Sequence, residues 1–286
     1  MEVDINAWVN EATPERVSFR QAVHMVLHAV ASSEYLKTSM VMKGGMLLGI
    51  RYHSSRFTED IDFSSKMKIS DVSTDEFIGS MNDALSLAED DLGYGIRCRV
   101  QSLKVQPKNH KEAKFPSFNI TIGYARTTVQ RELTRLDAGQ CPNTIKIDYS
   151  FNEDTCKVDD VLIGDEAISV YSIYDVVAEK YRSILQQVVR NRNRRQDIYD
   201  LYYLISQVDF SEEEKIKIFD AFIFKSKERL EGFEYLMDRG ALDLAEVIAA
   251  SEKDYRLLAD EIPDGLPDFN DAYSVVRDFF KNLPWG

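Results

Sequence analysis

Long apolar runs are missing from this sequence of 286 residues. A helix that crosses a bilayer needs about 20 consecutive apolar residues, and no stretch approaches that length, so we expect no membrane span. The amino-terminal stretch MEVDINAWVNEATPE is acidic and lacks the basic-then-apolar layout of a secretion signal. Together these absences favour a soluble, cytoplasmic protein.

Cysteine is scarce as well. The three cysteines, Cys98, Cys141 and Cys156, are widely spaced and form no CxxC pair. This pattern argues against a disulfide framework and against a zinc site, and it favours reduced thiols. Repeats and low-complexity tracts are also absent.

Positive charge is in deficit, since the formal net charge is −13. Such a balance argues against a protein that coats DNA, but a nucleic-acid substrate needs only a local basic patch. The hydrophobic share of 44% and the charged share of 29% are those of a globular protein. The length suffices for one large domain or two smaller ones, each with its own core.

The most informative stretch covers residues 43–63, KGGMLLGIRYHSSRFTEDIDF. Gly44 and Gly45 follow an extended apolar segment, where two glycines let backbone N–H groups approach a phosphate without interference from Cβ. Asp60 and Asp62 are one residue apart, so on a strand they point to the same face. Two carboxylates on one face suit a Mg²⁺ ion that carries a nucleoside triphosphate. The alternative is a solvated acidic turn at TEDID.

Hydrophobic periodicity places this stretch in a sheet with helices. It predicts amphipathic helices over residues 15–31 and 73–88 and a short helix over 46–52. His24 and His28 on the first helix have metal-ligand spacing but lack a third ligand, so we interpret them as core-edge histidines. A basic loop at 107–116 is expected to be solvated. Strands that would form one sheet are predicted over residues 38–42, 57–64, 96–105, 117–125 and 144–151.

Asp148 stands out in the last of these strands, TIKIDYSF, because it is polar in the middle of an apolar segment. Burial of an unpaired carboxylate there would cost several kcal/mol. In-line nucleotidyl transfer with two metal ions needs a third carboxylate beside a DxD pair, and Asp148 is the natural candidate. The alternative is an edge-strand aspartate that faces solvent and pairs with Lys146.

The chain becomes helical after residues 158–170. Helices are predicted over residues 172–190, with Ser172 as a cap, and over 196–207, and the chain beyond Ser211 is helical and acidic. We therefore expect an α/β (α+β) fold, with a mixed sheet in a catalytic domain at 1–165 and a helical domain at 166–286 that completes the active-site cleft.

The unit of strand, Gly-Gly, short helix and DxD-bearing strand resembles the first motif of the polymerase-beta-like nucleotidyltransferase superfamily. The variant found here, KGG followed by R-x-T-x-D-I-D-F, resembles the AbiEii/AbiGii toxin family of nucleotidyltransferases. Two later stretches, Ala178-Glu179-Lys180 and RQDIYDL at 195–201, are similar to further motifs of that family. The resemblance covers about residues 40–205.

The resemblance implies roles for these residues. Gly44 and Gly45 would cradle the triphosphate, and Asp60 and Asp62 would hold the metals. Asp148 as a third ligand rests on the strand pattern instead, because the family pattern does not fix that residue. Mg²⁺ or Mn²⁺ would be the cofactor, and an NTP the substrate.

Two further motif residues, Arg56 and Thr58, would support the nucleotide-binding loop. Lys180 would neutralise triphosphate charge; its alternative is a surface lysine paired with Asp175 or Glu179.

Asp197 and Asp200 would share one face of a helix. One of them could hydrogen-bond Lys180 or orient the acceptor, and the other could cap the helix or pair with Arg194 or Arg195. The basic cluster Arg190–Arg195 could grip RNA or a nucleotide phosphate, or could be a solvated turn.

The function that the resemblance implies is transfer of a nucleoside monophosphate from NTP to the 3′ end of a tRNA, with release of pyrophosphate. The protein would then be a toxin of a toxin–antitoxin or phage-defence system, with a cognate antitoxin as partner. Alternatives are a kinase-like or AMP-transferring enzyme that acts on a protein hydroxyl, and a catalytically idle binding module. The retained acidic pair disfavours the idle module, because unused neighbouring carboxylates are an electrostatic cost.

Overall fold

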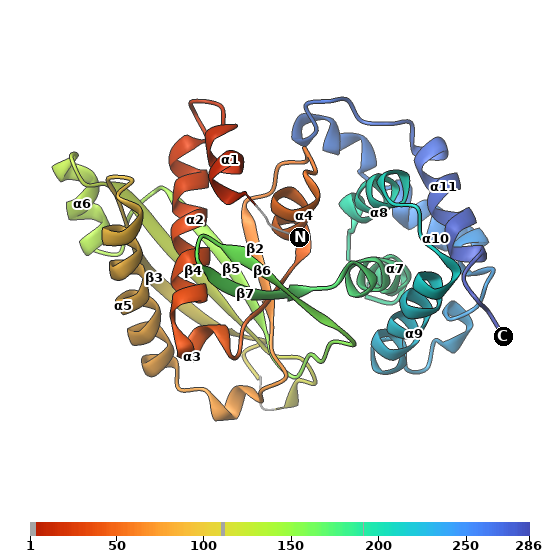
Figure 1. Cartoon of the computed structure of the whole chain (residues 1–286). Coiled ribbons are helices and arrows are strands. Elements are labelled where there is room, and N and C mark those ends of the chain that lie inside the picture. The colour runs from red at the N-terminus through yellow and green to blue at the C-terminus, as the bar shows by residue number, and fades with distance from the viewer. Residues whose placement is uncertain (1–3, 110–111, 191) are drawn as a thin grey trace. The chain divides into compact units, whose positions relative to one another are not determined.

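A computed structural model describes residues 4–109, 112–190 and 192–286, and it divides into two compact units (Figure 1). The sheet unit comprises residues 1–51, 59–154 and 158–170. The helical unit comprises residues 52–58, 155–157 and 171–286. Neither unit is one continuous piece of chain, because residues 52–58 and 155–157 belong to the helical unit although the sheet unit surrounds them in the sequence.

The sheet unit is built on a mixed seven-stranded sheet in the order β3-β4-β5-β2-β1-β7-β6. Strand β2 (Asp60–Ser64) runs parallel to β5 (Thr144–Ser150) and antiparallel to β1 (Val41–Lys43). The antiparallel pair β3 (Ile96–Gln106) and β4 (Ser117–Arg126) extends the sheet beyond β5, and β7 (Glu166–Tyr171) and β6 (Val158–Ile163) extend it beyond β1. The DxD strand therefore lies in the interior of the sheet.

One face of the sheet is apolar and is covered by α2 (Val17–Ser32) and α5 (Thr74–Leu92) (Figure 1). Phe77 of α5 stacks against Tyr149 of β5 and contacts Phe118 of β4 edge-on, with ring centroids 5.7 Å apart in both pairs. Ile61 and Phe63 of β2 are fully buried. Because side chains alternate along a strand, the aspartates beside them lie on the opposite face.

The remaining helices of the sheet unit are short. Among the described residues they are α1 (Ile5–Asn10), α3 (Glu34–Lys37), α4 (Gly44–Tyr52, whose last residue belongs to the helical unit), η1 (Ile69–Asp71) and α6 (Gln130–Asp137). Helix α4 begins at the Gly pair and buries five consecutive apolar or small positions after Gly45.

The predicted elements of this unit are largely confirmed, including the single sheet. The largest boundary differences are that the first strand begins at Val41 rather than at residue 38, the DxD strand begins at Asp60 rather than Phe57, and α5 ends at Leu92 rather than at residue 88. The hairpin β6–β7 was not predicted. Its sequence, VDDVLIGDEAISVY, carries the signal nonetheless: two β-prone runs flank Gly164, which has a φ of +65°.

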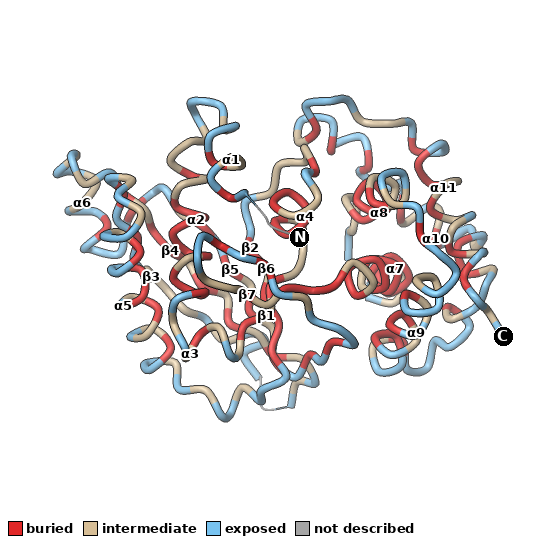
Figure 2. Tube along the Cα trace, viewed as in Figure 1, coloured by how far each residue is buried: buried red, intermediate tan, exposed pale blue. Residues whose placement is uncertain are grey.

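The helical unit is organised around α7 (Ile173–Arg190), which Figure 2 shows buried along most of its length. As predicted, Ser172 caps this helix, since its Oγ accepts from the Asp175 N–H at 3.2 Å. Asp175 is fully buried, accepts hydrogen bonds from the N–H groups of Cys156 and Lys157, and forms an ion pair with Lys225 at 3.0 Å. These contacts attach residues 155–157 to the helical unit.

The other helical elements of this unit are, in chain order, α8 (Arg195–Gln207), α9 (Glu212–Arg229), η3 (Glu234–Leu236), η4 (Ala241–Asp243), α10 (Ala245–Glu252), η5 (Tyr255–Glu261) and α11 (Phe269–Lys281). Tyr181 of α7 packs against Phe280 of α11 and donates its hydroxyl proton to the Val276 carbonyl at 2.8 Å. The helical character predicted beyond residue 172 is confirmed.

No helix in the described ranges has both the length and the apolar character needed to span a bilayer. All three cysteines are free thiols: Cys98 and Cys141 are buried and Cys156 is exposed.

Candidate active site

Three aspartates share one face of the sheet. In the parallel ladder between β2 and β5, Asp62 lies directly opposite Asp148, and Asp60 lies opposite Lys146. Residues directly opposite each other on neighbouring strands project to the same side. The structure therefore places Asp60 and Asp62 in a strand, on the same sheet face as the predicted third carboxylate, and it excludes an edge-strand position for Asp148.

Gly44 lies against the carboxylate of Asp62. Its φ is +77°, and a Cβ built at this position would lie 1.9 Å from Oδ2 of Asp62. Both facts require glycine: the backbone conformation is disfavoured for any L side chain, and the space is already filled by a carboxylate. The start of α4 and the DxD strand thus approach each other at this glycine.

Asp148 is held on one side only. The amide Nδ2 of Asn119 on β4 donates to Oδ2 of Asp148 at 3.2 Å, and the two residues are direct partners in the antiparallel ladder between β4 and β5. The other oxygen, Oδ1, is buried and has no hydrogen-bond partner in the described part of the chain. A buried carboxylate oxygen without a partner is costly, so such a group calls for an explanation such as an ion or a substrate proton.

The acidic face also carries lysines. Lys43 is the direct partner of Asp62 on β1, and its ammonium forms an ion pair with Glu153. Burial raises the pKa of Asp60; the charge of Lys146 opposes this shift, and the charges of Glu59 and Asp148 add to it. Carboxylates that repel one another in this way gain from a cation placed between them.

The donor atoms on this face decide whether a divalent metal could bind there. Within residues 4–109, 112–190 and 192–286, no group of three His, Cys, Asp or Glu side chains converges closely enough to enclose an ion as it stands. The backbone register nevertheless puts three oxygen-donor side chains on one face, and oxygen ligands are those that Mg²⁺ prefers. In donor chemistry, therefore, the residues on this face fit a divalent cation.

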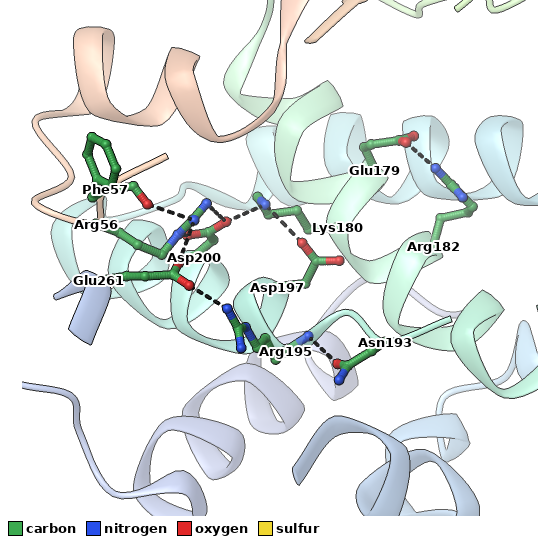
Figure 3. A network of polar contacts seen from close by, with 10 residues as sticks. All are labelled: Arg56, Phe57, Glu179, Lys180, Arg182, Asn193, Arg195, Asp197, Asp200 and Glu261. Carbon is green, nitrogen blue, oxygen red and sulfur yellow. Dashed lines mark hydrogen bonds and ion pairs between the residues drawn. The ribbon is translucent and has the colours of Figure 1, made fainter. Parts of the chain in front are cut away.

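A second group of motif residues forms a buried ion cluster in the helical unit (Figure 3). Arg56 donates to Asp200 from Nε at 2.8 Å and from Nη2 at 3.1 Å, a bidentate pair in which the Asp200 side chain is fully buried. Burial by itself would raise the pKa of Asp200, but the charges of Arg56 and Lys180 outweigh it and hold that pKa below its ordinary value.

Lys180 completes this cluster. Its Nζ donates to Oδ2 of Asp200 at 2.6 Å and to Oδ1 of Asp197 at 3.0 Å (Figure 3). Burial by itself would lower the pKa of Lys180, but Asp200 and Asp197 raise it above its ordinary value. Oδ2 of Asp197 is buried and lacks a hydrogen-bond partner among the described residues. The aspartates at i and i+3 thus share one helix face, as predicted, and both bind Lys180.

Several alternatives from the sequence are wrong. Lys180 is not a surface lysine paired with Asp175 or Glu179, because Asp175 pairs with Lys225 and Glu179 pairs with Arg182. Neither Asp197 nor Asp200 pairs with the arginines at 194 and 195. Arg195 instead donates to Glu261 at 2.5 Å. Thr58 is half-buried at the end of the 52–58 segment.

The cluster Arg190–Arg195 contains residue 191, which lies outside the described residues. Arg190 and Arg192 are exposed, while Arg194 and Arg195 are half-buried. Because the Arg190 and Arg192 side chains are exposed, solvent and ligands can reach them. The suggested contact with RNA or phosphate stays a prediction.

Sequence reasoning missed Asn119, Glu261 and Tyr203. Asn119 is a polar residue within the apolar strand SFNITIGYA, the same signal that singled out Asp148, so the pattern could have drawn attention to it. Glu261 and Tyr203 carry no such signal, because their partners lie far away in the sequence.

Comparison with known proteins points to one family. The model for the nucleotidyl transferase AbiEii toxin family, described as belonging to a type IV toxin–antitoxin system, matches residues 26–276. This is the family that the Gly-Gly, DxD and later motifs resemble. Among curated proteins no sequence match was found.

Two solved structures from Helicobacter pylori are similar. The protein JHP933 aligns with a TM-score of 0.50 at 13% identity over 96% of this chain and 93% of its own. A second, named only as a candidate nucleotidyltransferase, aligns with a TM-score of 0.49 at 13% identity over 95% of this chain and 96% of its own. The likeness to JHP933 shows a shared fold.

Proposed function

Because the chain belongs to the AbiEii nucleotidyl transferase toxin family, we propose that it transfers a nucleoside monophosphate from an NTP to an RNA acceptor, the 3′ end of a tRNA. The 3′-hydroxyl oxygen would attack the α-phosphorus, and the bond from that phosphorus to the bridging oxygen would break, so that pyrophosphate leaves. Mg²⁺ or Mn²⁺ would be the cofactor.

The observation that carries this proposal is the position of Asp62 opposite Asp148, with Asp60 on the same face. In addition, Oδ1 of Asp148 is buried and finds no hydrogen-bond partner among the residues that the structure describes. Asp60, Asp62 and Asp148 would hold the metal. A divalent cation bound there would neutralise triphosphate charge and favour deprotonation of the attacking hydroxyl. Gly44 and Gly45, at the start of α4, would offer backbone N–H groups to the phosphates.

The proposal also includes the helical unit. Lys180 and Asp197 would contribute to the reaction, together with Arg56 and Thr58. The proposal also places the boundary between the catalytic domain and the helical domain at about residue 165.

Incubation with α-³²P-labelled or γ-³²P-labelled NTPs, Mg²⁺, and total tRNA or total protein tests the reaction. We expect label on tRNA from the α position only. An Asp62→Asn variant should lose this labelling, whereas Asp137→Asn, which alters an exposed aspartate, should retain it.

Other outcomes would decide between the alternatives. γ-label on protein would indicate a kinase, and α-label on protein would indicate an AMP-transferring type of enzyme. A folded protein that transfers no label in any combination would leave the idle binding module. Full activity in Asp62→Asn would refute the metal assignment specifically.

The family description also bears on partners, because a type IV toxin–antitoxin system includes an antitoxin. We propose that a cognate antitoxin counteracts this chain and that the reaction takes place in the cytoplasm, where NTPs and tRNA occur together. A role in phage defence is part of the same proposal. Growth arrest on expression of the wild type, but not of Asp62→Asn, would support a toxin.

A further inference from the structure

Residues 52–58, the linker segment, have an unexpected place in the fold. In the sequence they join the helix that begins at Gly44 to the strand that carries Asp60 and Asp62. In the structure they belong to the helical unit, whereas residues 1–51 and 59–154 belong to the sheet unit. The linker segment connects the proposed phosphate-binding turn to the proposed metal-binding strand. It is packed with elements of the helical unit, whereas the chain on either side of it belongs to the sheet unit.

Contacts at both ends of the linker segment hold it. At its carboxyl end Arg56 forms the bidentate pair with Asp200 of α8, and the Phe57 N–H donates to the Glu261 carbonyl at 2.8 Å. At its amino end the hydroxyl of Tyr203, also on α8, lies 2.8 Å and 2.9 Å from the carbonyl oxygens of residues 52 and 53. A segment of seven residues is thus fixed to α8 at both ends and to η5 at one.

The four charged side chains of the buried ion cluster that holds the linker segment have no net charge. Arg56 and Lys180 supply two cations, and Asp197 and Asp200 supply two anions, with all four side chains less than a tenth exposed. Asp200 accepts from both cations, so removal of either one would leave a buried carboxylate short of a partner. Lys180 already directs two of its three donors at Asp197 and Asp200, which suits support of the Arg56–Asp200 pair better than contact with a mobile triphosphate.

We propose that Arg56, Lys180, Asp197 and Asp200 are positioning residues, which anchor the linker segment and thereby set the placement of Asp60, two residues beyond its end. This role rests on the proposed nucleotidyl transfer. It differs from the expectation that Lys180 neutralises the triphosphate directly. Its direct consequence is that loosening the anchor weakens metal binding and slows turnover without a matching loss of NTP affinity.

Hydrogen–deuterium exchange on the full chain tests the anchor without any need for activity. In Asp200→Asn and Arg56→Lys, amides of residues 52–58 should exchange at least about 10-fold faster than in the wild type, while the interior strands of the sheet keep their protection. The matched control is Arg97→Lys, which alters an exposed bidentate pair with Glu89. Unchanged exchange at 52–58 in both anchor variants would overturn the proposal.

If Asp200→Asn fails to fold, Tyr203→Phe provides a milder test, because it removes only the hydroxyl contacts to residues 52 and 53. It should raise exchange at those two positions and leave the Phe57 amide protected. Protection equal to the wild type at both positions would contradict attachment at the amino end.

Mn²⁺ binding and kinetics test the consequence for the site. We expect Arg56→Lys and Asp200→Asn each to weaken Mn²⁺ binding, followed by electron paramagnetic resonance, by about 10-fold. Each should lower kcat by about 10–100-fold with KM for NTP within about 3-fold of the wild type. The double variant should be no worse than the worse single one, since both act on one contact.

Other results would contradict the positioning role or the proposed function. If Lys180→Gln raises KM for NTP while Arg56→Lys and Asp200→Asn keep wild-type kcat and Mn²⁺ affinity, Lys180 binds the triphosphate directly and the positioning role is wrong. If the wild type transfers no nucleotide to any acceptor, the proposed function fails, whereas exchange and Mn²⁺ binding still decide whether the anchor places the metal site.

Discussion

Gly44 and Asp62 are matched in shape: a Cβ at position 44 would lie 1.9 Å from Oδ2 of Asp62, on a backbone with φ of +77°. Gly44→Ala should therefore displace the Asp62 carboxylate and strain the turn. We expect activity to fall by about 100-fold and the free energy of unfolding to fall by about 1–3 kcal/mol. Activity assays and urea unfolding measure the two effects.

Gly79 provides a matched control for that substitution. It lies inside α5, and a Cβ there would meet no atom within 4 Å. Gly79→Ala should raise the free energy of unfolding by about 0.5–1 kcal/mol and leave activity unchanged. Equal activity in Gly44→Ala and Gly79→Ala would contradict the packing argument.

Asn119 should matter for metal binding, because its amide fixes one oxygen of Asp148 and leaves the other without a partner. Asn119→Leu removes the donor from a buried carboxylate. We expect Mn²⁺ affinity to fall by about 10-fold, as for other residues that orient metal ligands. Isothermal titration calorimetry with Mn²⁺ measures this directly, with the exposed Asn143→Leu as control. Wild-type affinity in Asn119→Leu would show that Asp148 needs no orientation.

His24 should make stability depend on pH. Its ring is buried, Nδ1 lies 2.8 Å from the Tyr94 hydroxyl, and burial, together with the charge of His28, lowers its pKa from 6.5 to about 4. As the pH falls, His24 therefore takes up a proton near pH 6.5 in the unfolded chain but only near pH 4 in the folded chain. Stability from this residue is therefore lost as pH falls through that window, by about 3 kcal/mol in total.

Urea unfolding between pH 7 and pH 4.5 measures the slope. His24→Gln should flatten it, whereas His53→Asn, at an exposed left-handed position that asparagine tolerates, should keep the wild-type slope. An unchanged slope in His24→Gln would place the pH dependence elsewhere.

Lys180→Met should destabilise the protein strongly, because it leaves Asp197 and Asp200 buried with too few cations. A truncated partner of a buried ion pair typically costs about 3–5 kcal/mol. The control is Lys215→Met on α9, which breaks a surface pair with Glu212 and should cost less than about 1 kcal/mol. Similar unfolding midpoints for the two variants would mean that the aspartates take up protons or find other partners.

The local parts of the fold and site could be predicted from the sequence. Period-2 alternation marked the strands that carry Asp60, Asp62 and Asp148, and it fixed the face on which each side chain lies. The Gly pair marked the start of α4. These features depend on neighbours within a few residues, so a single sequence contains them.

The long-range parts could not be predicted. Which residue lies opposite Asp148 depends on strand order and register, so Asn119 was not recognised. The ion cluster joins Arg56 to Asp200 over 144 residues, and nothing near Arg56 indicates that its segment leaves the sheet unit. For Lys180 the surface alternatives Asp175 and Glu179 were wrong, because each has another partner that only the tertiary fold supplies. The suggested hydrogen bond from Lys180 to Asp197 or Asp200 is present.

The separation of 144 residues between Arg56 and Asp200 also has a consequence for biosynthesis. At about 5–20 residues per second, a ribosome needs about 7–30 s after it adds Arg56 before it adds Asp200. During that interval the guanidinium remains without its final carboxylate, and the helical unit cannot be completed. Folding of this chain should therefore finish only late in translation, and a nascent chain halted before α8 should expose its linker segment to proteases.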